Sequence, residues 1–282
     1  MTGMRDDTEE LAQPEIEAGD ISDASPSGHS GASIFDPVLC ELCYLWFSPP
    51  GGLVLDPFAG GSVRGIIASR LGRRYIGVDL RPEQIEANKA QADLATGPAP
   101  VWRVGDSRNI KKIVGARTKA DFIFSCPPYA NLEVYSDDPA DLSAMDYPAF
   151  REAYFEIIRE TCALLKPDRF AVFLVGDVRG KDGMYYGLPE DTVLAFREAG
   201  LGKYNEAILV TAVGSLPIRA ARAFEHSRKL GKTHQNLLIF CKGDPVKATA
   251  AIGPVEFDRG EDEDDAASDR PGQSPDGFGG EM

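Results

Sequence analysis

The sequence predicts a doubly wound α/β fold, in which a mostly parallel sheet is covered by helices on both faces. Short runs of branched and aromatic residues, typical of buried strands, alternate with segments of helical periodicity along the 282 residues. Glycine-rich or acidic residues follow several of these runs, where the strands are expected to end. The last two runs are neighbours in the sequence with only an insert between them. This favours an antiparallel strand at the C-terminal end of the sheet.

Most expected elements are bounded by residues that start or stop them. Asp36 is expected to cap the first helix, with Pro37 in its first turn. An Asp-Pro pair ends the first strand, Gly72 stops the second helix, and Pro82 lies near the start of the third. We therefore expect strands at about residues 53–55, 74–79, 101–104, 121–124, 170–175, 206–213 and 235–241, and helices at about 37–47, 63–71, 82–94, 148–165 and 189–199.

The negative charge of the chain belongs to its ends. The formal net charge is −14, of which residues 1–32 carry −7 and residues 254–282 carry −8, which leaves +1 for residues 33–253. Acidic segments that are rich in Ser, Gly and Pro and lack apolar periodicity are typical of disordered chain. We expect disordered tails at residues 1–32 and 244–282 around one domain at residues 33–243. A near-neutral domain leaves a nucleic-acid partner open.

The five cysteines indicate reduced thiols in a cytoplasmic protein, because an odd number does not suit a disulfide framework. Cys40 and Cys43 have the spacing of half a zinc site. No second Cys or His pair follows them, and the apolar residues around them favour a buried helix face. No apolar run has membrane-spanning length. We therefore expect neither a metal nor a membrane partner.

Four expected strands end in residues that suit a nucleotide-like ligand. A strand, a glycine-rich turn and a helix N-terminus form a cradle for such a ligand at residues 53–63. Asp79 lies 23 positions after Asp56, where an acid can accept both hydroxyls of a ribose, although it can also be a helix-capping acid. Asp106 can accept a hydrogen bond from an adenine amino group or can be a plain turn residue.

The order of these motifs resembles that of the S-adenosylmethionine-dependent DNA amino-methyltransferases, which modify N6 of adenine or N4 of cytosine. The residues that carry the resemblance are Asp56-Pro57-Phe58-Ala59-Gly60-Gly61-Ser62, Asp79, Asp106 and Pro127-Pro128-Tyr129. The glycine motif precedes the Pro-Pro-Tyr motif, as in the small phage and prophage members. The resemblance covers roughly residues 33–243. It implies a Rossmann-like methyltransferase fold and double-stranded DNA as the partner.

The resemblance also implies a site for S-adenosylmethionine. The glycine turn would lie against the methionine part of the cofactor, Asp79 would hold the ribose, and Asp106 would hold the adenine. A segment before the glycine motif, residues 34–36, would pack on the cofactor. The expected cofactor-binding residues are Phe35, Asp56, Pro57, Phe58, Gly60, Gly61, Ser62, Asp79, Asp106 and Ser107.

The Pro-Pro-Tyr segment has a chemical logic of its own. An exocyclic amino nitrogen is a poor nucleophile because its lone pair is delocalised into the ring. Hydrogen-bond acceptors aimed at its two protons favour a pyramidal nitrogen that can attack a methyl group. The aromatic side chain would stack on a base flipped out of the duplex. The expected catalytic residues are Ser125, Cys126, Pro127, Pro128 and Tyr129.

Cys126 departs from the family pattern, which has Asp, Asn or Ser at this position. A neutral thiol is a weak acceptor, so amino methylation would depend more on the Pro127 carbonyl. One alternative is methylation at C5 of cytosine, with Cys126 as a thiolate nucleophile. Two others are an RNA methyltransferase and a catalytically silent DNA-binding protein.

A basic stretch between the last two expected strands is a candidate DNA contact. Residues 217–234 hold five Lys or Arg against one Glu, and can neutralise backbone phosphates or form a solvated helix. Residues 130–147 and 183–187 are further candidates for base contact. No separate domain is left to read a long target, which suggests a short site or a homodimer. The expected DNA-binding residues are Arg219, Arg222, Arg228, Lys229 and Lys232.

Overall fold

The computed structural model describes residues 35–129, 136, 138–211 and 216–255. The N-terminal tail expected at residues 1–32, residues 130–135 and 137 of the stretch 130–147, and residues 256–282 of the C-terminal tail lie outside the described residues. None of the described helices is long and apolar enough to cross a membrane.

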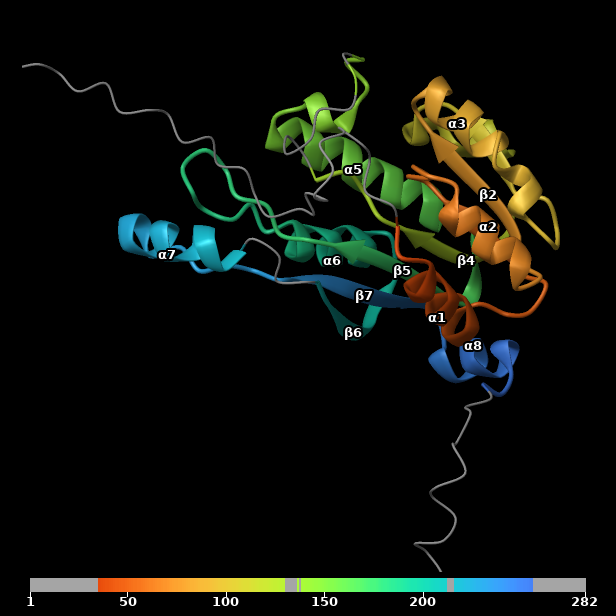
Figure 1. The fold of residues 1–282 in the computed structure, drawn as a ribbon. Helices are drawn as coiled ribbons and strands as arrows, with labels where there is room; N and C mark the ends of the chain where they lie inside the picture. Colours follow the sequence, from red (N-terminus) through yellow and green to blue (C-terminus); the bar gives the residue numbers. More distant parts are fainter. Residues whose placement is uncertain (1–34, 130–135, 137, 212–215, 256–282) are drawn as a thin grey trace, which may run out of the picture.

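Seven strands form one sheet in the order β3-β2-β1-β4-β5-β7-β6 (Figure 1). Strands β1 to β5 are parallel to one another, and β7 runs antiparallel to both β5 and β6. The expected doubly wound sheet with an antiparallel strand at its C-terminal end is therefore confirmed. The strands are β1 (Leu53–Asp56), β2 (Arg74–Asp79), β3 (Val101–Val104), β4 (Ala120–Ser125), β5 (Leu165–Val175), β6 (Gly202–Val210) and β7 (His234–Lys242).

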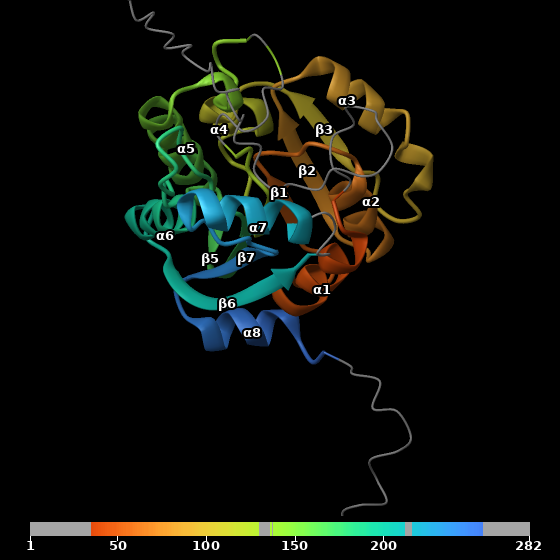
Figure 2. The ribbon, with the colours of Figure 1, turned by 60° about the vertical axis from the view of Figure 1, so that its left-hand side comes forward.

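Helices cover both faces of this sheet (Figure 2). Helices α1, α2, α3 and α8 pack on one face, and α4, α5 and α6 pack on the other. Successive side chains of β4 alternate between the two cores, with Phe122 and Phe124 in one and Ile123 in the other. The helices are α1 (Pro37–Phe47), α2 (Val63–Arg70), α3 (Pro82–Lys89), α4 (Ile110–Val114), α5 (Tyr147–Cys162), α6 (Leu188–Glu198), α7 (Leu216–Ser227) and α8 (Pro245–Ile252).

Most expected elements are present with shifted ends. The carboxylate of Asp36 caps α1 and accepts from the backbone amides of Val38 and Leu39, as expected. Helix α3 stops at Lys89, and a 3₁₀ turn at Ala92–Leu94 forms the rest of the helix expected there. Strand β5 begins at Leu165 rather than at residue 170. The sequence did not indicate this earlier start, because residues 166–169 are polar or proline and are not part of the apolar run.

Part of the C-terminal tail expected at residues 244–282 forms a helix, α8 (Pro245–Ile252). Asp244 caps helix α8 by accepting from the amide of Val246 at 2.8 Å. Ala248 and Ile252 are four positions apart and both are buried in the core beside α1. The sequence did not predict this short helix, because the region is rich in Gly and Pro. The ordered domain therefore extends at least to the end of α8.

Candidate functional site

The loops that follow β1, β2, β3 and β4 are tied together at the carboxyl edge of the sheet. The order of strands reverses between β1 and β4, which is where ligands bind in such sheets. Ser107 Oγ, after β3, donates to the Pro57 carbonyl at 2.6 Å. Gly60 N donates to Asp79 Oδ2, after β2, at 2.9 Å. Residues predicted from four separate stretches thus form one connected site.

The carboxylate of Asp56 is the centre of a buried polar cluster at this edge. Its side chain is fully buried, and both of its oxygens are occupied. Oδ1 accepts from Phe58 N at 3.1 Å and from Ser125 Oγ at 2.5 Å. Oδ2 accepts from Tyr75 Oη at 2.7 Å and from Arg64 Nε at 2.6 Å. Asp56 therefore connects the glycine loop to the Pro-Pro-Tyr loop through its bonds to Phe58 and Ser125. Both of its oxygens accept bonds within the cluster, so neither is free for a cofactor.

Arg64 and Tyr75 are the residues of this cluster that were not expected from the sequence, and Arg64 makes the larger number of contacts. The Arg64 side chain is 5% exposed. Its Nη2 donates to the carbonyls of Phe58 (2.5 Å) and Ala59 (3.0 Å). Its guanidinium lies 4.6 Å from the centre of the Phe35 ring. A signal was present in the sequence. Arg64 lies four positions before Ala68 on the helix face that packs against the sheet, where an unpaired arginine would be costly.

The glycine turn leaves an open surface next to the N-terminus of α2. Gly60 has φ +49°, a left-handed conformation that other residues rarely adopt. A side-chain carbon added at Gly61 would meet no described atom within 4 Å. Ser62 Oγ donates to Gln91 Oε1 at 2.5 Å, and Phe58 packs on Tyr154 and Phe173. The turn is therefore anchored to the core through Phe58, while its surface at Gly61 remains accessible.

Asp79 and Asp106 differ in how much of each carboxylate is available. Asp79 is partly exposed, and its two oxygens accept from the amides of Gly60 and Arg81. Burial raises its pKa, although these amide hydrogen bonds oppose the rise. Asp106 caps a 3₁₀ turn through Arg108 N and forms an ion pair with Arg108 at 2.7 Å. The geometry therefore gives Asp106 the turn role, while Ser107 is turned inward to Pro57.

The residues around the Pro-Pro-Tyr motif point in different directions. Ser125 is fully buried and its hydroxyl is committed to Asp56, so the structure removes it from the group of residues that can face a substrate. Cys126 is partly exposed, and its Sγ lies 3.7 Å from Tyr129 Oη. Burial raises the pKa of Cys126, with Arg64 and Tyr129 opposing the rise. The thiol is therefore neutral at pH 7, which disfavours the thiolate alternative.

The expected basic stretch forms helix α7 and the turn after it. Arg222 and Arg228 are exposed, and the guanidinium of Arg228 lies 4.9 Å from the centre of the Phe224 ring. Lys229 and Lys232 contact the segment between β5 and α6, since Lys232 Nζ lies 5.7 Å from the ring centre of Tyr185. The side chain of Arg219 lies outside the described set. The cations therefore extend from α7 toward the loop that leaves β5.

Residues 34–90 match the family model described as DNA methylase, N6_N4_Mtase. Over this segment the chain is similar to the DNA methylases. The Type II methyltransferase M.SmaI of Serratia marcescens is 38% identical over 58 residues, and the DNA adenine methyltransferase YhdJ of Escherichia coli (strain K12) is 41% identical over 58 residues. Each match covers 21% of this chain and 20% of the relative, so the chain spans about a fifth of these relatives' length.

A solved structure agrees with the fold. A methyltransferase from Pyrococcus furiosus superposes with a TM-score of 0.50 at 16% identity, over 77% of this chain and 88% of that chain. The expected Rossmann-like methyltransferase fold is confirmed. The resemblance to the DNA amino-methyltransferases is likewise confirmed over residues 34–90, which contain α1, β1, the glycine motif, α2, β2 and α3.

The cofactor implied by this family, S-adenosylmethionine, fits the residues of the DNA methylase segment. The space beside Gly61 is free of described atoms within 4 Å, and α2 begins just after it, at Val63. Asp79 retains acceptor capacity, because each carboxylate oxygen takes only one of the hydrogen bonds described above. Phe35 packs edge-on against Phe124 at 5.6 Å and lies beside Arg64, and its contact with the cofactor stays a prediction.

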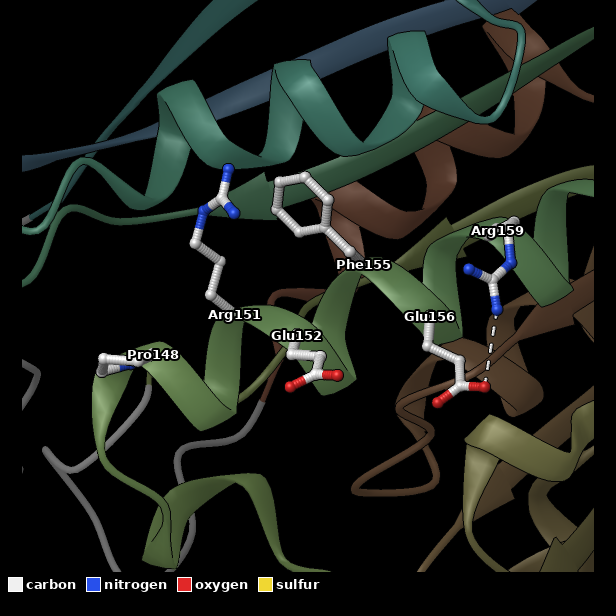
Figure 3. Close-up of a pocket in the computed structure, with 6 residues that line it drawn as sticks. All are labelled: Pro148, Arg151, Glu152, Phe155, Glu156 and Arg159. Atoms are coloured by element: carbon white, nitrogen blue, oxygen red, sulfur yellow. Dashed lines mark hydrogen bonds and ion pairs between the residues drawn. The ribbon is translucent and has the colours of Figure 1, made fainter.

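The cysteine pair and a hollow on α5 lie apart from this site. Cys40 and Cys43 are buried, and burial raises the pKa of Cys43 to about 12; among the described residues no group of three His, Cys, Asp or Glu can hold a metal. The hollow has charges that are largely paired, for example Arg159 with Glu156 at 3.5 Å and Arg151 with Asp191 at 2.8 Å. Its lining residues are Pro148, Arg151, Glu152, Phe155, Glu156 and Arg159 (Figure 3).

Proposed function

We propose that this protein transfers a methyl group from S-adenosylmethionine to an exocyclic amino group in double-stranded DNA, either N6 of adenine or N4 of cytosine. The observation that carries the proposal is the hydrogen-bonded connection between the glycine loop and the Pro-Pro-Tyr loop through Asp56 and Ser125. It brings a methyl-donor cradle and an amino-acceptor loop to adjacent strands, β1 and β4. The DNA methylase match at residues 34–90 supports the choice of DNA.

In this proposal the residues of the glycine loop and Asp79 hold the cofactor. Asp79 accepts from the ribose hydroxyls, and the open face of Gly61 supports the methionine part. When bound, the cofactor supplies an electrophilic methyl group on a sulfonium. The amino nitrogen of the base would take this methyl group, the sulfur would leave as a neutral thioether, and the released proton would pass to solvent. The protein contributes position and hydrogen-bond acceptors.

The acceptors come from the Pro-Pro-Tyr loop. The Pro127 carbonyl accepts from the amino group, and the Tyr129 ring stacks on the flipped base. The Tyr129 ring lies against Gly176 at the end of β5, where a side-chain carbon on the glycine would be 3.5 Å from Cε1. This contact supports a fixed ring plane. Cys126 borders the same space as a weak, neutral acceptor.

Helix α7 and the turn after it contact the phosphate backbone in this proposal. Arg222, Arg228, Lys229 and Lys232 extend from α7 to the loop after β5, and this row of cations is complementary to a duplex. The formal charge of the whole chain is −14, so long-range attraction to DNA depends on this local patch. A homodimer stays a prediction.

RNA is the second candidate substrate. The tRNA (guanine(10)-N2)-dimethyltransferase of Pyrococcus abyssi (strain GE5 / Orsay) is 26% identical over 127 residues, which cover 45% of this chain and 37% of that protein. This is a longer match than those to M.SmaI and YhdJ. N2 of guanine is also an exocyclic amino nitrogen, so the same loop chemistry would serve.

The test is to incubate the protein with methyl-labelled S-adenosylmethionine and unmethylated DNA or RNA, and then to digest each product to nucleosides. N6-methyladenine or N4-methylcytosine from DNA supports the proposal, and sequencing of the product locates the site. Label in RNA alone refutes the DNA substrate. Label as 5-methylcytosine refutes the amino target. Tyr129→Ala should abolish transfer, whereas Tyr204→Ala, which alters a half-exposed tyrosine on β6, should not.

A further inference from the structure

The segment between β5 and α6 contains a tight hairpin, residues 179–185. Arg179 and Tyr185 form an antiparallel bridge. Gly180 N donates to the Met184 carbonyl and Gly183 N donates to the Gly180 carbonyl, both at 2.8 Å. Arg179 Nη1 also donates to the Gly183 carbonyl at 2.8 Å, and Gly183 has φ +81°. The tip is therefore held in one shape by its own hydrogen bonds.

Met184 presents an apolar side chain from this fixed tip. It is 69% exposed, and its own amide is held by Asp182 Oδ1 at 3.0 Å. A large apolar side chain on a rigid, exposed turn has no partner within the hairpin. An apolar side chain this exposed on a turn of fixed shape is available for contact with another molecule.

Cations surround the base of the tip. The guanidinium of Arg179 lies 3.7 Å from the ring centre of Tyr185, and Lys232 Nζ lies 5.7 Å from the same ring. A side-chain carbon on Gly183 would be 3.2 Å from Lys229 Nζ, so Lys229 reaches the turn itself. Figure 1 shows this segment beside α7, both extending beyond the sheet. An apolar tip with three cations beside it, against the single acid Asp182 in the turn, suits a polyanion with apolar bases inside it.

The hairpin and the proposed base-binding ring share one anchor. Tyr129 lies against Gly176, the residue that follows β5. Next in the chain, Asp177 Oδ1 accepts from Val178 N at 3.0 Å and Gly187 N at 3.3 Å, and this closes the base of the hairpin. The tip and the ring therefore keep a fixed relation through the end of β5.

We propose that this hairpin enters the DNA duplex at the target base pair, with Met184 filling the space that the flipped base leaves. Apolar side chains, Met among them, are used as wedges between base steps, where they offset an unstacking cost of a few kcal/mol. Arg179, Lys229 and Lys232 neutralise the phosphates beside the entry point. The inference rests on the proposed function, because it requires DNA as the substrate.

The test compares Met184→Ala with the parent protein on two short duplexes that carry the modified site found by sequencing. In one duplex the target base is paired, and in the other it lies opposite an abasic position. Loss of the wedge should lower kcat/KM on the paired duplex by about tenfold or more, because unstacking is no longer offset. On the abasic duplex, where flipping costs little, the defect should shrink to about twofold or less. Met184→Leu should retain most of the activity on both.

Val246→Ala is the matched control, because Val246 is an equally exposed apolar residue (75%) on α8, on the other side of the molecule. It should leave both rates unchanged. Equal rates for Met184→Ala and the parent on the paired duplex refute the wedge, and so does an equal loss on both duplexes, which indicates a general structural defect. If the parent methylates no DNA at all, the proposed function fails instead, so the two failures are distinguishable.

Discussion

Replacing Arg64 by Met should destabilise the protein strongly, because it leaves the Asp56 carboxylate in the core without its counter-ion. The Arg64–Asp56 pair is 2.6 Å long, and the two side chains are 5% and 0% exposed. Removing one partner of a buried pair typically costs about 3–5 kcal/mol. The carbonyls of Phe58 and Ala59 also lose their donor. For a domain of this size the loss corresponds to a fall in Tm of roughly 6–20 °C.

The assay is equilibrium unfolding in urea, followed by fluorescence and circular dichroism, for a double-mutant cycle. Arg64→Met and Asp56→Asn should each be destabilising, and the double variant should be less destabilised than the sum by about 1–3 kcal/mol. Arg70→Met is the control, since Arg70 is exposed in the last turn of the same helix. It should change the free energy of unfolding by about 0.5 kcal/mol or less. Additive single effects, or an Arg64→Met variant as stable as Arg70→Met, would refute the buried cluster.

Three further predictions concern titratable side chains. Cys126→Ser should keep or raise the rate of methyl transfer, and loss of turnover would instead support the thiolate mechanism. Because burial raises the pKa of Cys126, its thiol should react with iodoacetamide more slowly than a free thiol at pH 8. Asp79→Asn should weaken S-adenosylmethionine binding about tenfold in calorimetry. In the parent, affinity should fall as pH falls through the raised pKa of Asp79, above its ordinary 3.8, and a flat profile would contradict the ribose contact. Burial raises the pKa of Asp121, but Lys166 Nζ at 2.7 Å and Leu53 N outweigh it and hold the pKa below 3.8. Asp121 therefore stabilises the fold above pH 3.8 and loses that effect as pH falls further; Asp121→Asn should cost about 1 kcal/mol at pH 7, with the difference vanishing in acid.

The sequence predicted the elements whose signals are local. The glycine turn, Asp79 and the Pro-Pro-Tyr motif each follow an apolar strand, and parallel strands bring their carboxyl ends to one edge. The cap at Asp36 was predictable for the same reason, because it depends on the next three residues.

The roles that were missed depend on contacts between distant residues. Asp56 was expected to touch the cofactor, yet its oxygens are taken by Arg64, Tyr75 and Ser125, up to 69 positions away. Ser125 was grouped with the catalytic residues because it adjoins Cys126, but strand alternation turns it into the core. Helix α8 was missed because two buried residues in an acidic, Gly-rich region give only a weak periodic signal.

The bond from Ser125 to Asp56 separates two duties within the acceptor loop. In this chain the residue at 125 fixes where the loop lies, by a hydroxyl that a solvent-facing neighbour cannot replace. The side chain at position 126 is therefore not needed to hold the backbone of this loop in place. Its chemistry can vary while the prolines and the tyrosine keep their positions, so a cysteine is admissible there without remodelling the fold. Under the proposed function, a substitution at position 126 would alter the contact with the target base without moving the prolines or the tyrosine.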